Sequence, residues 1–217
     1  MRPAVALVVA KSPVTGRVKT RLGREVGMER AADLAAAALL DTVAACAEAY
    51  GAARCHLALD GILAHGRLAD ELLEATAEWT FHPQRGDGFA ERLVHAHEDA
   101  ASFSGAPVVQ VGMDTPHLHV DALVEAASLL TDRDTAVLGP AYDGGWWLLG
   151  VGAPHLVTHL PDVPMSTAET GELTRQALVR AGARVTEIGA LRDVDEVLDA
   201  ELVAEAAPDT RFARSWR

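Results

Sequence analysis

The chain has 217 residues, 49% hydrophobic and 23% charged, which is typical of a globular protein with one sizeable core. Its formal net charge of −12, from 31 acidic and 19 basic residues, argues against a nucleic-acid partner and against anionic membrane surfaces. No apolar run approaches the roughly 18–20 residues that span a bilayer, and we find no secretion signal, so we expect one cytoplasmic domain over residues 1–217.

Apolar runs alternate with helical periodicities along the chain. Residues 4–10 are continuously apolar, as expected of a strand buried on both faces of a parallel sheet. Such alternation predicts an α/β fold, a three-layer α/β/α sandwich around a mainly parallel sheet, whose ligands bind beyond the carboxyl ends of the strands. Further strands are predicted at 55–59, 79–81, 107–111, 135–138 and 184–188, and helices at 29–50, 62–77, 89–102, 120–130, 167–181 and 194–206.

The loop after the first strand is rich in cations. Arginine supplies 17 of the 19 basic residues, so we expect the two remaining lysines, Lys11 and Lys19, to do something that a guanidinium cannot. Contacting a phosphate as a compact point charge is such a role. A P-loop is excluded because Pro13 and Val18 stand where its glycines would be. The loop therefore predicts a polyphosphate site, with a solvated basic turn as the alternative. Its cations are Lys11, Arg17, Lys19 and Arg21, and Gly16 shapes the turn.

Two carboxylates are candidate metal ligands. Asp114 follows the strand 107–111, where it could hold Mg²⁺ against phosphate oxygens, although it could also cap the next helix. Asp195 is our choice for the second ligand; either it or Asp193 could instead cap the last helix. His117 and His119 lie near Asp114, but the absence of a third suitably spaced histidine or cysteine argues against a separate metal site there.

The segment 143–147, Asp-Gly-Gly-Trp-Trp, predicts a tight turn that a ligand can approach closely. We assign Asp143 and Gly144 to the site and place Trp147 in the core. The alternative is a hairpin whose two tryptophans face opposite sides of a strand. A weaker signal, the segment 166–169, matches a capping box and predicts a local role at a helix start.

These segments, in this order, resemble the uncharacterised GT-A-like nucleotide-diphospho-sugar transferases, also described as selenium- or radical-SAM-domain-associated transferases. The resemblance extends from about residue 4 to residue 198. Its most specific mark is Lys-x-Pro-x-x-Gly-x-Val-Lys-Thr-Arg-Leu, which stands intact at residues 11–22. The family's Gly-Asp-Leu-Gly-Glu-Arg, Gly-Ser-Asp-Cys-Pro, Asp-Gly-Gly-Tyr-Tyr and Asp-Val-Asp-Thr-Pro-Glu-Asp motifs correspond to residues 86–92, 112–116, 143–147 and 193–199.

The resemblance implies a GT-A-like, Rossmann-like nucleotide-binding fold and a transferase that depends on Mg²⁺ or Mn²⁺. The metal would be held by Asp114 and Asp195, and we expect Lys19 and Asp114 to be catalytic. The nucleotide would contact the phosphate loop through Lys11, Gly16, Arg17, Lys19 and Arg21, and its base would lie near Gly86, Asp87 and Gly88. The acceptor would bind against Asp143, Gly144, Gly145 and Trp146.

Departures from the family's motifs favour an altered acceptor. Met113 and Thr115 flank Asp114, Trp-Trp replaces Tyr-Tyr, and the closing motif lacks its Thr-Pro. We favour a GT-A-type glycosyltransferase; the alternatives are a guanylyl- or cytidylyltransferase-like nucleotidyltransferase that releases pyrophosphate, and a non-catalytic nucleotide-binding protein. The expected partners are a nucleotide or nucleotide-sugar donor and a small-molecule acceptor, with no nucleic acid and no membrane insertion. A homodimer stays open.

Overall fold

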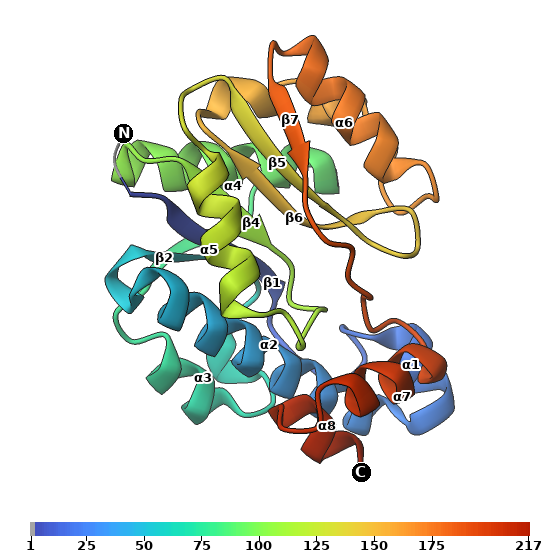
Figure 1. The fold of residues 1–217 in the computed structure, drawn as a ribbon. Coiled ribbons are helices and arrows are strands. Elements are labelled where there is room, and N and C mark those ends of the chain that lie inside the picture. The colour runs from blue at the N-terminus through green and yellow to red at the C-terminus, as the bar shows by residue number, and fades with distance from the viewer. Residues whose placement is uncertain (1–2) are drawn as a thin grey trace.

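The computed structural model describes residues 3–217, so Met1 and Arg2 of the expected domain lie outside the described residues. Within this range, seven strands form one sheet in the order β3-β2-β1-β4-β6-β5-β7 (Figure 1). Strand β6 is antiparallel to both of its neighbours, whereas every other neighbouring pair is parallel. The prediction of a mainly parallel sheet is confirmed. The strands are β1 (Val5–Lys11), β2 (Cys55–Asp60), β3 (Thr80–Pro83), β4 (Val108–Val111), β5 (Thr135–Pro140), β6 (Trp146–Val151) and β7 (Arg184–Glu187).

Helices cover both faces of the sheet (Figure 1). Alternate residues of β1 enter different cores: Ala6 and Val8 pack on the face of α2 and α5, and Leu7 and Val9 pack on the face of α4. A strand buried on both faces must be apolar throughout, which explains the uninterrupted run in the sequence. The first face carries α2 (Met28–Tyr50), α3 (Ala69–Ala75) and α5 (Val120–Leu129), and the second carries α4 (Phe89–Ser104) and α6 (Thr170–Arg180).

A third, smaller core joins segments from the two ends of the sequence. Leu22 and Leu34 pack there with Val203 and Phe212, all buried. Figure 1 shows the helices that carry these residues side by side at one end of the molecule. The core therefore holds the loop after β1 next to the segment before the last long helix. Its helices, besides α2, are α1 (Thr20–Val26), α7 (Val197–Ala206) and α8 (Arg211–Trp216).

The predicted helix over 62–77 is interrupted. A 3₁₀ turn covers Leu63–His65, and α3 begins only at Ala69. Gly66 lies against Pro13 of the loop after β1, where an added Cβ would approach the proline Cδ to 2.8 Å. Close packing against a distant loop therefore overrides the local helical pattern here, which explains why the predicted bounds are wrong.

The last predicted helix begins later than residue 194. Helix α7 starts at Val197, and Glu196 and Asp199 form its capping box. Neither Asp193 nor Asp195 is its cap, so this alternative role for the two aspartates is wrong. Similarly, α6 starts at Thr170 rather than at 167, and Thr170 Oγ1 accepts a hydrogen bond from the Thr167 backbone N–H at 3.0 Å. The side chains of Ser166 and Glu169 do not form the capping box that the sequence suggested.

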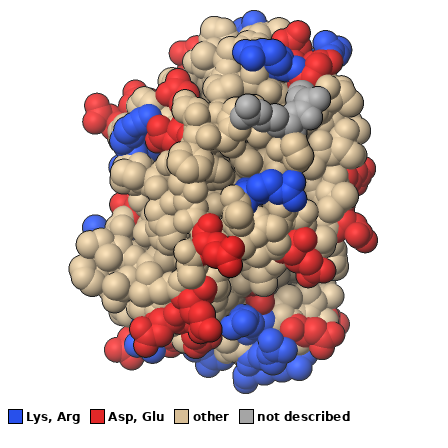
Figure 2. All heavy atoms as spheres, turned by 90° about the vertical axis from the view of Figure 1, so that its left-hand side faces the viewer, with Lys and Arg blue, Asp and Glu red and all other residues tan. Residues whose placement is uncertain are grey.

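On the face shown in Figure 2, lysines and arginines lie singly or in small groups among acidic residues, with a broad uncharged area between them. A continuous basic stripe, the usual footprint of a nucleic-acid site, is not seen on this face. Across residues 3–217, no helix combines the length and the apolar character needed to cross a membrane.

Candidate active site

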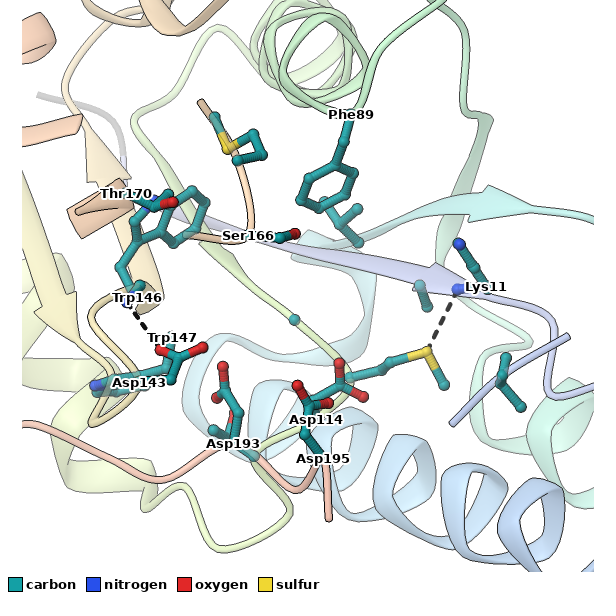
Figure 3. A pocket seen from close by; sticks show the side chains of 18 of the residues that line it. Lys11, Phe89, Asp114, Asp143, Trp146, Trp147, Ser166, Thr170, Asp193 and Asp195 are labelled. Atoms are coloured by element: carbon teal, nitrogen blue, oxygen red, sulfur yellow. Dashed lines mark hydrogen bonds between the residues drawn. The ribbon is translucent and has the colours of Figure 1, made fainter. Parts of the chain in front are cut away.

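A cleft of about 840 Å³ opens at the carboxyl ends of β1 and β4 (Figure 3). Ligands of open α/β sheets bind at this edge. Two backbone hydrogen bonds bring the C-terminal segment to it: the Val194 N–H donates to the Asp114 carbonyl at 2.9 Å, and the Tyr142 N–H donates to the Leu191 carbonyl at 3.1 Å. Segments that are far apart in the sequence therefore line one cavity.

Lys19 links three of these segments. Its side chain is only 8% exposed, and its Nζ lies 2.8 Å from Asp114 Oδ1 and 3.1 Å from Asp195 Oδ1. Burial alone would lower the pKa of Lys19, but the charges and hydrogen bonds of the two carboxylates outweigh this effect and raise it above its ordinary value. Lys19 therefore stays charged and ties the phosphate loop to both predicted metal ligands.

The other cations of this loop surround the same cleft. Lys11, Arg17 and Arg21 all line it, and Arg21 also lies 3.4 Å from Asp195 Oδ2. Gly16 does not line the cleft; its φ of +77° lets the loop turn back. The structure thus brings together the cationic side chains predicted for the phosphates, while Gly16 acts on the shape of the loop.

Four aspartates, which we call the carboxylate cluster, lie along one side of the cleft: Asp114, Asp143, Asp193 and Asp195 (Figure 3). Burial and, to a smaller extent, the charges of its three neighbours raise the pKa of Asp193 to about 7, although Lys19 opposes them. The single ammonium of Lys19 therefore leaves this side of the cleft with an excess of negative charge.

An oxygen-rich, negatively charged cluster suits a hard divalent cation. No group of three side chains within residues 3–217 is arranged to hold a metal ion without help. Mg²⁺, however, is commonly bound by one or two carboxylates together with phosphate oxygens of the substrate. The residues therefore fit a metal that is held jointly by the protein and a phosphate ligand.

His117 and His119 do not join this cluster. Neither lines the cleft. Burial lowers the pKa of His117 to about 4, helped by the charges of His119 and Arg192, so its ring is neutral near pH 7. No metal-binding group of three formed by these histidines with Asp114 is found in the described part of the chain.

The segment 143–147 forms the turn of the β5–β6 hairpin and the start of β6. Asp143, Gly145 and Trp146 line the cleft, and Asp143 Oδ1 accepts a hydrogen bond from the Gly145 N–H at 2.8 Å. Trp147 is 3% exposed and its indole N–H donates to the Gly189 carbonyl, so it belongs mainly to the core, as predicted. The antiparallel hairpin that the sequence left as an alternative is present.

Gly144 has a packing role at this turn. Its φ is +89°, and an added Cβ would lie 2.1 Å from the carbonyl oxygen of Ala168. Its own carbonyl accepts a hydrogen bond from the Gly171 N–H at 2.8 Å. Gly144 does not line the cleft. Its role is to let the hairpin pack closely against the loop before α6.

The glycine-bounded turn before α4 does not line the cleft itself but precedes residues that do. Gly86, Asp87 and Gly88 do not line it, whereas Phe89 and Arg92 do. The Gly86 carbonyl accepts a hydrogen bond from Arg92 Nε at 3.2 Å, and the Asp87 N–H donates to Glu91 at 2.9 Å. These bonds position the start of α4, whose side chains reach the cavity.

Two glutamines that were not expected from the sequence also line the cleft. Gln84 follows β3, and its amide donates to the carbonyls of Ala10 and Ala58 at 2.9 and 3.0 Å. Gln110 lies within β4 and is 2% exposed. A polar residue inside an otherwise apolar strand was the signal that could have found Gln110. Gln84 lies in a loop and had no such mark.

Comparison with known proteins identifies a family and structures of similar fold. The model of a family described as "Uncharacterized protein conserved in bacteria (DUF2064)" matches residues 42–167. The chain is similar to a solved structure described as a candidate nucleotide-diphospho-sugar transferase from Desulfovibrio desulfuricans G20, with 26% identity and a TM-score of 0.82, covering 100% of this chain and 93% of the other. Among curated proteins, none matches the sequence.

Two further structures share the fold alone. CMP:2-keto-3-deoxy-manno-octonic acid synthetase in complex with CTP is 14% identical, with a TM-score of 0.56 and coverage of 96% of this chain and 100% of the other. A nucleotidyl transferase from Methanothermobacter thermautotroptrophicus is 20% identical, with a TM-score of 0.58 and coverage of 97% and 98%. The predicted fold class is confirmed.

Proposed function

This chain belongs to the DUF2064 family of bacterial proteins, and we propose that it is a metal-dependent transferase that acts on a nucleotide-diphospho-sugar. The observation that carries the proposal is the contact of Lys19 with both Asp114 and Asp195 inside one cleft. A loop suited to phosphates and carboxylates suited to a divalent cation thereby line one cavity. The 26% identical structure, described as a candidate nucleotide-diphospho-sugar transferase, supports the choice of substrate class.

In this proposal the diphosphate lies against the cationic loop. Lys11, Arg17 and Arg21 bind its oxygens from the cleft wall, and Lys19 lies close enough to the carboxylates to hold the phosphate end beside them. Asp114 and Asp195 would hold Mg²⁺ or Mn²⁺, which supplies positive charge to neutralise the diphosphate. Fixed cations stabilise negative charge that develops on a departing phosphate because they need no reorganisation during the reaction.

The acceptor would bind at the β5–β6 hairpin turn, against Asp143, Gly145 and Trp146. Its hydroxyl oxygen would form a bond to the anomeric carbon as the bond from that carbon to the phosphate breaks. The nucleoside diphosphate leaves with the bonding electron pair, and the hydroxyl proton passes to a carboxylate or to water. The aspartates and the indole orient the acceptor for this displacement.

Ligand binding followed by product analysis tests the proposal. Nucleoside-diphosphate sugars and nucleoside triphosphates, each with and without Mg²⁺, are screened by thermal shift. A ligand at about 100 times its Kd should add roughly 2.7 kcal/mol of stability. Released nucleoside diphosphate supports glycosyl transfer. Pyrophosphate from a triphosphate would instead identify a nucleotidyltransferase, whose fold this chain shares. Stabilisation without turnover would leave a nucleotide-binding protein.

A matched pair of arginines provides the control. Arg21 and Arg24 are both exposed residues of α1, but only Arg21 lines the cleft. Arg21→Ala should weaken nucleotide binding, whereas Arg24→Ala should not. If no nucleotide stabilises the protein, or if both variants respond equally, the phosphate site is wrongly assigned.

A further inference from the structure

Gln110 is a buried polar side chain in the middle of the sheet. It belongs to β4, where its Cα lies opposite Leu7 of β1 and Leu149 of β6. Its residue is only 2% exposed, yet it lines the cleft. Burying an amide among apolar neighbours costs free energy unless its polar atoms have hydrogen-bond partners. We therefore ask which partner each polar atom of Gln110 has.

His97 accounts for the amide oxygen. It lies on α4, is fully buried, and its Nε2 is 3.0 Å from Gln110 Oε1. Its Nδ1 is buried and has no partner among residues 3–217. A proton on Nδ1 would be an unpaired buried donor, whereas a proton on Nε2 can be donated to Gln110. The orphaned Nδ1 therefore favours the Nε2–H tautomer, and with it the assignment of the amide oxygen towards His97.

With the amide oxygen directed towards His97, the amide nitrogen of Gln110 is directed towards the cleft. In the described part of the chain it makes no hydrogen bond, and the fully enclosed unpaired side-chain atoms there belong to Trp79, His97 and His117 instead. Since Gln110 lines the cavity, its N–H donors are accessible from the cleft. A histidine on the opposite side of the amide thus fixes a hydrogen-bond donor at the floor of the site.

Part of the lining of this cleft is uncharged. Phe89, Trp146 and Met165, which we call the aromatic wall, line the same cleft. Figure 3 shows Phe89 across the cavity from Asp114, Asp193 and Asp195, and Trp146 next to Asp143 at the hairpin turn. The Trp146 indole N–H donates to Thr174 Oγ1 at 3.2 Å, which fixes the plane of the ring. The wall offers apolar contact area, which suits an uncharged group.

We propose that Gln110, oriented by His97, is a specificity-determining residue that donates a hydrogen bond to an oxygen of an uncharged, ring-shaped group packed against Trp146. If the proposed function holds, this group belongs to the acceptor. Only the identification of the group as the acceptor rests on that function. The chemical class is a neutral ring with an apolar face and a carbonyl or hydroxyl oxygen at its edge.

Two probes of similar shape test the donor without nucleotide or metal. Cyclohexanone carries an oxygen where methylenecyclohexane carries a CH₂ group, and the alkene is the more hydrophobic of the two. Titration of ¹⁵N-labelled protein follows the indole N–H of Trp146, assigned with Trp146→Phe, and the side-chain amide of Gln110. Cyclohexanone should bind about 3–10-fold more tightly, which is the range expected for one hydrogen bond.

Variants separate the donor from general packing. Gln110→Met keeps the length of the side chain and should abolish the preference for the ketone. Gln84→Met is the matched control, because the Gln84 amide already donates to two backbone carbonyls, and it should retain the preference. His97→Phe frees the amide to rotate, so it should reduce the preference while methylenecyclohexane still binds.

Three results would overturn the inference: equal affinities for the two probes, an unchanged preference in Gln110→Met, or no shift at Trp146 with either probe. Shifts of the Gln110 amide in the wild-type protein provide the answer should Gln110→Met fail to fold. The nucleotide screen is independent of this titration. Failure of the screen with a positive titration would remove the proposed donor substrate but leave the ring-binding site.

Discussion

The two sides of the cleft are built on different principles. The carboxylate cluster is held by ion pairs between segments far apart in the sequence, with Lys19 contacting Asp114 and Asp195. On the other side the polar contacts are neutral hydrogen bonds, between His97 and Gln110 and between Trp146 and Thr174. Charged ligands and salt should therefore act mainly on the first side, whereas the second depends on packing and on a neutral His97.

The largest expected effect is a loss of activity on substitution in the carboxylate cluster or at Lys19. Asp114→Asn should lower the transfer rate by about 10²–10³, because it removes a ligand of the metal that would neutralise the phosphate charge. Lys19→Arg should lower it as well, since the larger guanidinium cannot occupy the buried position of the ammonium between two carboxylates. Steady-state turnover of the nucleotide identified by the screen measures both effects.

The control for this pair is Asp121→Asn, which changes an exposed aspartate of α5 outside the cleft. It should leave turnover unchanged. A folded Asp114→Asn protein that retained more than a tenth of the wild-type rate would contradict the assignment of Asp114. Full activity in Lys19→Arg would show that a compact ammonium is not required.

The hairpin turn, which joins the two sides, should be the next most sensitive point. Gly144→Ala should destabilise the protein by about 2–4 kcal/mol, because positive φ and a clash with the Ala168 carbonyl act together. Gly16→Ala has a similar φ of +77° but no neighbour within 4 Å, so it should cost only about 1 kcal/mol. Urea unfolding measures both, and equal costs would contradict the role given to the Gly144 contact.

Acid should weaken the neutral side. Burial lowers the pKa of His97 to about 4, although its bond to Gln110 opposes this, whereas an unfolded histidine titrates near 6.5. The unfolded chain therefore binds more protons between these values, so stability should fall as pH drops below 6.5, by about 1–2 kcal/mol at pH 5. His97→Gln should make this slope of the urea midpoint against pH less steep, and the part due to His56 and His117 should remain. An unchanged slope would show that His97 is protonated in the folded protein.

Alkali should weaken the charged side by a smaller amount. The raised pKa of Asp193, about 7 when folded against 3.8 ordinarily, means that the folded state binds more protons between these values. Its contribution is therefore fully present at low pH and is lost as pH rises towards 7. Without metal at pH 8, Asp193→Asn should be more stable than wild type by on the order of 1 kcal/mol, discounted for partial exposure. Thermal melts in chelator at pH 8 and pH 5 test this, and an equal gain at both would contradict it.

Much of the charged side could be predicted from the sequence because its residues follow strands directly. The rarity of lysine marked Lys19, and the turn after an apolar strand marked Asp114; the structure places the two side chains 2.8 Å apart. The neutral side could not be predicted in this way. Gln110 and His97 are thirteen positions apart in a strand and a helix, and only the packing of α4 on the sheet makes them partners.

The sequence by itself determined the alternation of strands and helices, the cationic loop and the turn that carries Asp114, since each depends on near neighbours in the chain. Only the tertiary structure decided the break before α3, the antiparallel direction of β6, and the start of α7 at Val197, which leaves Asp193 and Asp195 outside its cap. These features depend on contacts between distant segments, whose energies local propensity does not contain.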